Sequence, residues 1–484
     1  MIQKIWLHPP MAVGRIGPSK VPCDNFHWAA SDLRPRGTGK TTIQPGETLN
    51  VAADGSVTRS LPTAISFKDS VGFKPVCPFF ELHGEWQVDG KTITGQITLQ
   101  VLELFNLKAS DLRWTVEVAN LKPNHYTLAD GDRILATLEL TGDVTERQVL
   151  RGSSPIGAVQ PLVPIGQSVV LGSVQLTRPN PDFPEFRIRF TPAAGNVYGP
   201  NNLPTRLEGL QQRLASASPP RISAWEKFQL PTNFLILNPE AAWCQFVATD
   251  EDPRTNPGGL YASEDDTGVS LGLVDDVCDG VIRCSLPGGL QAIAQIVVGP
   301  PDYAPDRRPV VSLADGLADR VKRDDVLEPA YVEQLEKTAA EVNDLLERVL
   351  ETMESMNLDF QNQRVRGENR AIAIAQGFSE TAAEGKAFPP MNPLPGQPLP
   401  LTALGRQRHR RLIALEVLED KLREQPNLIS QWIREPKTTD RFYDRKMPAL
   451  MRGSDRYPMH VTRRQYDLLI AWAKRLQSDA EAGT

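Results

Sequence analysis

The sequence predicts an α+β protein, with a β-rich, sandwich-like first two-thirds and a mainly helical last third. Short apolar runs with period-2 alternation fill the first part, and apolar residues at helical spacing follow residue 315. The 484 residues are 40% hydrophobic and 23% charged, which is ordinary for a globular chain. We therefore expect a β-rich domain over 1–215, a second β-rich segment over 216–314 and a helical domain over 315–484.

Strands are predicted where apolar and polar residues alternate, because successive side chains of a strand point to opposite faces. One such stretch is 112–118, and in another Phe186, Ile188 and Phe190 alternate with Arg187 and Arg189. This pattern predicts a strand with one wet face that carries both arginines. Further runs rich in Val, Ile and Leu lie at 134–140, 168–176 and 294–298, and turn signals lie at Asp54–Gly55, Asp89–Gly90 and Asp130–Gly131.

Helices are predicted in the last third. From Tyr331 to Met353 the apolar residues recur every three or four positions, so they share one face. That face either packs on the chain's own body or forms a short coiled-coil seam for a partner. Residues 388–400 are rich in proline and predict a stiff, extended connector. Thr462 is placed to cap a final helix that continues to Trp472.

Composition narrows the classes of function. The net charge of −6 gives no basic surface for nucleic acid, and no apolar run is long enough to span a membrane. The N-terminal segment lacks the apolar core of a secretory signal. Five scattered cysteines predict reduced thiols in a cytoplasmic protein, and the six histidines show no spacing that predicts a metal site.

Two motifs carry reactive residue types. Residues 37–42 (GTGKTT) lack the first glycine of a phosphate-binding loop, so we read them as a polar loop. Residues 275–284 gather Asp275, Asp276 and Asp279 around a thiol, and any of the three could act as a general base. Negative neighbours raise the pKa of a thiol, which argues against a cysteine nucleophile here. Asp279–Gly280 is also typical of a turn that joins two strands.

Four stretches, in order along nearly the whole chain, resemble one known family. They are 8–17 (HPPMAVGRIG), 67–82 with the motifs FKD and FFEL, 274–313 with VDDVCDG, GPPDYAP and VVSL, and 447–472 with MP and the helix that follows Thr462. Together they resemble the lysine ε-oxidase and glycine oxidase family, whose members carry a cysteine tryptophylquinone cofactor. Two details depart from that family. Residues 74–78 lack its Arg-Gln pair, and Cys278 stands where the family has serine.

The resemblance implies the scaffold without its chemistry. The family builds its quinone from a cysteine and a tryptophan beyond the final helix, and the twelve residues after Trp472 contain neither. We therefore predict no cofactor and a divergent scaffold protein that serves as a binding or assembly subunit. Its expected partner is a second copy, a separate chain that supplies the missing segment, or a flavin-dependent modifying enzyme of the kind that matures this family.

Two alternatives stay open. The first is an amino-acid or amine oxidase that performs oxidative deamination and releases hydrogen peroxide. Its cysteine tryptophylquinone would come from a partner chain or from an unrecognised pair, with Cys278 or Cys284 joined to Trp432 or Trp472. The second is an enzyme of different chemistry that uses one of the three aspartates as its base.

Overall fold

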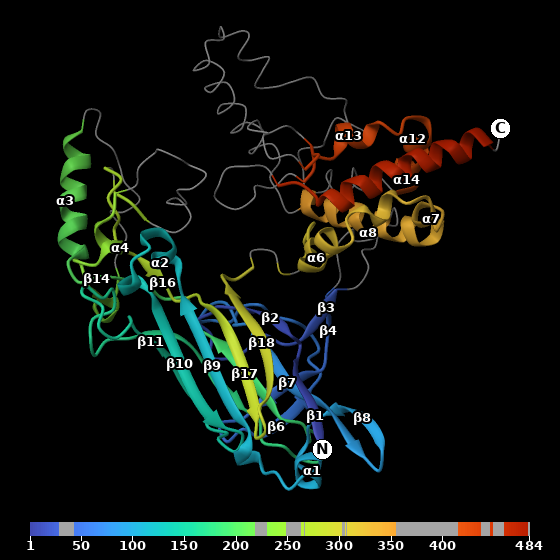
Figure 1. The fold of residues 1–484 in the computed structure, drawn as a ribbon. Coiled ribbons are helices and arrows are strands. Elements are labelled where there is room, and N and C mark those ends of the chain that lie inside the picture. Colours follow the sequence, from blue (N-terminus) through green and yellow to red (C-terminus); the bar gives the residue numbers. More distant parts are fainter. Residues whose placement is uncertain are drawn as a thin grey trace. The chain divides into compact units, whose positions relative to one another are not determined.

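The chain has an α+β fold whose strands belong mostly to its first part and whose helices belong mostly to its C-terminal part (Figure 1). The structure is a computed structural model, and it describes residues 1–28, 43–217, 230–247, 263–265, 267–302, 305, 307–354, 415–436, 446–448 and 459–482. Contacts divide the chain into two units. The first comprises Met1–Phe26 and Pro45–Tyr303, and the second His27–Gln44 and Ala304–Thr484. The predicted connector 388–400 and the loop 37–42 lie outside the described residues.

The first unit contains two large sheets. The six-stranded sheet runs β1 (Ile2–His8), β7 (Phe79–Val88), β13 (Arg187–Pro192), β12 (Val169–Leu176) and β11 (Gln148–Gly152), with β8 (Lys91–Gln96) paired to β7. The five-stranded sheet runs β10 (Ile134–Thr141), β9 (Arg113–Asn120), β17 (Asp279–Leu286), β18 (Leu290–Gly299) and β2 (Met11–Arg15). Most neighbours pair antiparallel, and β18 pairs parallel with β2. Both sheets contribute to one hydrophobic core, as the predicted sandwich requires.

Smaller elements complete this unit. Two short sheets are formed by β15 (Leu235–Leu237), β14 (Val197–Pro200) and β16 (Val274–Asp275), and by β5 (Thr48–Val51) and β6 (Val57–Ser60). A third short sheet, formed by β3 (Phe26–Trp28) and β4 (Ile43–Pro45), belongs mostly to the second unit. The helices are α1 (Leu99–Leu104), α2 (Lys122–Thr127), α3 (Leu203–Ser216) and α4 (Ala242–Gln245). Leu203, Leu207, Leu210 and Leu214 are buried along α3, since residues three and four apart share a face of a helix.

Turn chemistry explains part of the topology. Asp54–Gly55 joins β5 to β6 and Asp89–Gly90 joins β7 to β8, as predicted. The predicted turn at Asp279–Gly280 is wrong, because Asp279 begins β17 and pairs there with both β9 and β18. The chain turns instead at Gly288 and Gly289, whose φ angles of +89° and +83° suit glycine. Because β17 and β18 lie between β9 and β2, strands of the segments 1–215 and 216–314 share one sheet.

The second unit is helical. Its helices are α6 (Leu313–Val321), α7 (Pro329–Val332), α8 (Leu335–Glu354), α12 (Leu415–Glu424), α13 (Leu428–Trp432) and α14 (Arg463–Ala482). Val342, Leu346 and Val349 of the predicted stripe are buried in one cluster with Leu469 and Trp472 of α14. Packing within the chain is therefore confirmed as the use of this face.

The ends of these helices follow local chemistry. The predicted stripe is interrupted, since α7 ends at Val332 and α8 begins at Leu335. The cap at Thr462 is confirmed, because its Oγ1 accepts a hydrogen bond from the Gln465 backbone N–H at 3.1 Å. In the reciprocal hydrogen bond, the Gln465 Oε1 accepts from the Thr462 backbone N–H at 2.9 Å. In the described part of the chain, no helix is long and apolar enough to cross a membrane.

Candidate functional site

The candidate site lies on the polar face of the six-stranded sheet, around Arg187 and Arg189 of β13. Period-2 geometry places Phe186, Ile188 and Phe190 in the core and both arginines on the opposite face. The predicted strand is confirmed, but the prediction that its arginine-bearing face is exposed to solvent is wrong. Arg187 is only 6% exposed and Arg189 only 9%. Residues of the segments 17–26 and 47–53 lie over this face and line two pockets on it.

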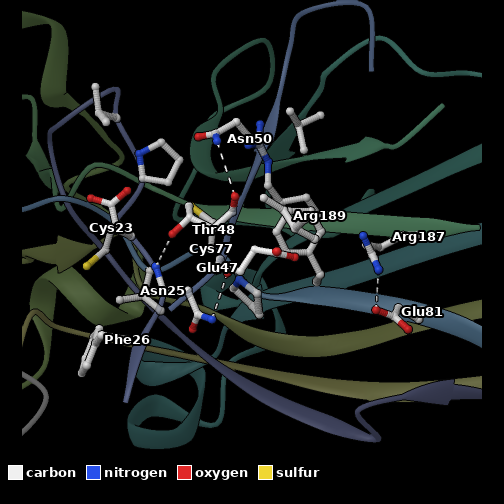
Figure 2. Close-up of a pocket in the computed structure, with 18 residues that line it drawn as sticks. Cys23, Asn25, Phe26, Glu47, Thr48, Asn50, Cys77, Glu81, Arg187 and Arg189 are labelled. Carbon is white, nitrogen blue, oxygen red and sulfur yellow. Dashed lines mark hydrogen bonds and ion pairs between the residues drawn. The ribbon is translucent and has the colours of Figure 1, made fainter. Parts of the chain in front are cut away.

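The first pocket, called here the thiol pocket, has a volume of about 520 Å³ (Figure 2). Its wall includes Cys23, Cys77, Asp24, Glu47, Glu81 and the two arginines. Every acid in that wall already has a cationic partner. Glu81 pairs with Arg187 at 2.6 Å, Glu47 with Arg59 at 3.5 Å and Asp24 with Lys74 at 3.7 Å.

The two thiols of this pocket are protonated at neutral pH. Burial raises the pKa of both Cys23 and Cys77 to about 11. The Asp24 carboxylate acts in the same direction on Cys23. A protonated thiol is a poor nucleophile and a poor metal ligand, so these residues do not form a reactive cysteine centre.

The second pocket, called here the arginine pocket, has a volume of about 630 Å³ and shares Arg189 with the first. Arg147, Arg189 and Lys20 contribute three cationic side chains to its wall. No carboxylate occurs among the described residues that line it. Ser173, Gln175 and Thr191 supply side-chain oxygens, and the rest of the wall is largely apolar, with Val51, Val149, Val170 and several prolines.

Arg189 is fixed in place by a side-chain amide. Its guanidinium donates to Gln175 Oε1 at 3.1 Å. The Gln175 Nε2 donates in turn to the backbone oxygens of Ala52, Ala53 and Thr145. These bonds orient the Gln175 amide so that its Oε1 faces Arg189. The Nε of Arg189 is buried and has no hydrogen-bond partner.

The electrostatics of the two arginines differ sharply. Arg187 contacts two carboxylates, those of Glu81 and Glu185. Arg189 forms no ion pair with any described carboxylate, and neither does Arg147, whose Nε donates to Ser173 Oγ at 2.7 Å. Burial lowers the pKa of Arg189; the Cys77 thiol opposes this effect and the positive charge of Arg147 adds to it. Arg189 is therefore a buried cation whose counter-charge is missing from the described protein.

The three predicted aspartates serve different parts of the fold. Asp275 pairs with Lys122 Nζ at 2.5 Å. Asp276 is fully buried and accepts hydrogen bonds from the backbone N–H groups of Gly195 and Asn196. Asp279 is exposed at the start of β17.

The buried position of Asp276 perturbs its acidity. Burial raises its pKa to about 7, although the two N–H donors work in the opposite direction. A pKa near neutrality suits a general base. A substrate needs access to such a base, however, and this carboxylate is 0% exposed. Its contacts indicate that it holds the Gly195 loop in place.

The residues considered for a quinone are all buried. Cys278 Sγ donates to the Leu171 backbone oxygen at 3.3 Å, and burial raises the pKa of both Cys278 and Cys284. Trp432 and Trp472 belong to the core of the second unit, whereas both cysteines belong to the core of the first.

One Cys–Trp juxtaposition was not predicted from the sequence. Cys284 of β17 lies directly opposite Trp114 of β9, and both side chains are 0% exposed. Strand alternation alone marks each residue as inward-facing, but only the register of the sheet reveals that they are neighbours.

Comparison with known proteins adds no assignment. No protein-family model matches the chain, and no curated protein matches it. Among the described residues, no group of three or more His, Cys, Asp and Glu side chains is arranged to hold a metal ion.

Proposed function

We propose that this protein is a binding or assembly subunit, built on a scaffold like that of the lysine ε-oxidase and glycine oxidase family and working without a quinone of its own. The observation that carries the proposal is the arginine pocket. Three cationic side chains line this pocket, and no described carboxylate in its wall neutralises them. Such a wall is suited to holding a ligand.

The reactive residue types also favour binding over catalysis. Burial keeps the thiols of Cys23 and Cys77 protonated, and Cys278 and Cys284 are enclosed in the core. Asp276 has a pKa suited to a base, but it is fully buried and already hydrogen-bonded by the backbone. None of these groups combines a suitable pKa with access to a substrate.

We place the protein in the cytoplasm as part of this proposal. All five cysteines are free thiols, which fits a reducing compartment. A second copy, a separate chain or a flavin-dependent modifying enzyme is the partner that the scaffold resemblance implies.

One observation favours the alternative, an oxidase with its own cysteine tryptophylquinone. Cys284 and Trp114 are directly opposed on neighbouring strands, so a crosslink between them would not require distant segments to meet. Against it, both side chains are 0% exposed, and a quinone there would be closed to an amine substrate and to oxygen.

Intact mass and an ultraviolet–visible absorption spectrum of the purified chain separate the two functions. The binding proposal predicts the mass of the unmodified sequence and no absorption beyond the aromatic band. A quinone would shift the mass by the added oxygens less the lost hydrogens and would add a band at longer wavelength. That result would overturn the proposal, and loss of the band in Cys284→Ser would place the crosslink at Cys284.

A further inference from the structure

The arginine pocket contains more positive charge than the described protein neutralises. Arg189 is nine-tenths buried, and its Nε has no hydrogen-bond partner. Arg147 lies close enough to lower the pKa of Arg189 by like-charge repulsion. Side chains such as arginine are seldom buried without a partner, because removing an ion from water costs several kcal/mol.

The neighbouring arginine shows how the same fold neutralises a buried cation. Arg187, two residues away on β13, contacts both Glu81 and Glu185. The sheet thus supplies carboxylates to one arginine and only a neutral amide oxygen to the other. The missing negative charge points to a ligand that enters the arginine pocket.

We propose that the arginine pocket binds a doubly charged oxyanion group of the phosphate class, held between the guanidinium groups of Arg189 and Arg147. Two guanidinium groups match two negative charges, and their forked donors suit an oxyanion with several oxygens. This inference gives a ligand class to the proposed binding role. It is independent of whether the chain carries a quinone.

The charged residues of the wall favour an anion over a cation. Lys20 adds a third positive charge to the wall, and the hydroxyls of Ser173 and Thr191 supply further donors. The volume of about 630 Å³ exceeds that of a phosphate group alone. The oxyanion would therefore be one end of a small organic molecule, with the remainder occupying the rest of the pocket.

The thiol pocket is a poor second choice for the same ligand. Asp24, Glu47 and Glu81 line it and are paired with cations, so its wall offers no excess of positive charge to an anion. We therefore assign the ligand to the arginine pocket and not to the thiol pocket.

Thermal unfolding of the full chain at pH 8 tests the assignment, with inorganic phosphate titrated against chloride at matched ionic strength. We expect a saturable rise in Tm with phosphate and a smaller one with succinate, a dicarboxylate of equal charge. Arg147→Gln removes one charge at an exposed position and should weaken phosphate about 10-fold or more, the range for a charge-assisted hydrogen bond. Arg189→Lys should also weaken it, because an ammonium lacks the forked donors.

The matched control is Arg113→Gln, which removes an exposed arginine of β9 outside both pockets. It should leave the affinity within about two-fold. Absence of a saturable phosphate effect would overturn the proposal. So would an equal effect in all variants, which would place the phosphate elsewhere, and tighter binding of succinate, which would replace the phosphate class by a dicarboxylate.

Discussion

The thiol pocket and the arginine pocket share one charged side chain, Arg189, and differ in how their charges are balanced. In the thiol pocket every acid has a basic partner, and Arg187 contacts the carboxylates of Glu81 on β7 and of Glu185, just before β13. In the arginine pocket the two arginines have only neutral hydrogen-bond partners among the described residues. Paired acidic and basic side chains stabilise the fold. Basic side chains without a carboxylate partner can instead bind an anionic ligand.

The strongest test of this contrast is Arg187→Met. The substitution leaves Glu185, which is 4% exposed, and Glu81 without their cation. Removing one partner of a buried ion pair typically costs about 3–5 kcal/mol, and we expect a loss of that size in the free energy of unfolding. Chemical denaturation measures it. A loss below about 1 kcal/mol would show that Arg187 is not the charge that holds this face together.

A second buried charge, Asp276, extends the comparison to an acid without a basic partner. Its folded pKa of about 7 lies above the usual value, so the folded state binds the proton more tightly than the unfolded chain does. The contribution of Asp276 to stability should therefore be complete at low pH and should fall as the pH rises toward 7, by up to about 1.4 kcal/mol per unit. Asp276→Asn should remove that part of the slope, measured by denaturation between pH 5 and 7.

Asp279→Asn is the control for this pH dependence, because Asp279 is exposed on the same segment. Its slope should match that of the unsubstituted chain. Equal slopes in all three proteins would contradict the buried, proton-binding state of Asp276.

Arg189→Met should act in the opposite direction to Arg187→Met. In the absence of ligand, this substitution removes a buried positive charge that no carboxylate neutralises. It also removes the hydrogen bond from Arg189 to Gln175. We expect a gain of about 1 kcal/mol in chloride buffer, since replacing buried charge by apolar volume is often stabilising. The same denaturation experiment checks the sign. A loss as large as that of Arg187→Met would mean that Arg189 has a counter-charge within the protein.

Glu47→Gln should have the smallest effect. Glu47 and Arg59 are both about half exposed, and exposed pairs contribute about 0–1 kcal/mol. We expect a change in stability of at most about 0.5 kcal/mol and an unchanged phosphate affinity. Tighter phosphate binding in this variant would move the anion into the thiol pocket and end the distinction between the two pockets.

Much of the fold could be predicted because it depends on local alternation. The strands around Trp114 and Phe190 follow from period-2 patterns, and the cap at Thr462 follows from its position before an apolar helix. The turn at Asp279–Gly280 was mispredicted because the dipeptide favours a turn locally, whereas pairing with β9 and β18 makes it a strand. Strand pairing across long sequence separations is not visible in a local pattern.

Only part of the candidate site could be predicted from the sequence. The alternation around Ile188 places Arg187 and Arg189 on one face, but it predicts that water covers them. Only the folded structure shows that residues 17–26 and 47–53 lie over that face. It also shows that Arg147, the residue directly before β11, lines the same pocket as Arg189. Which arginine receives carboxylates likewise depends on the register between β13 and β7.

The most direct test of the missing counter-charge is an anomalous-scattering map of crystals soaked in selenate, a doubly charged oxyanion that resembles phosphate. We predict a selenium peak in the arginine pocket, within hydrogen-bonding reach of the Arg189 guanidinium and on the side that faces Arg147. An empty arginine pocket at saturating selenate, or a peak only in the thiol pocket, would show that the positive charge there does not bind an oxyanion.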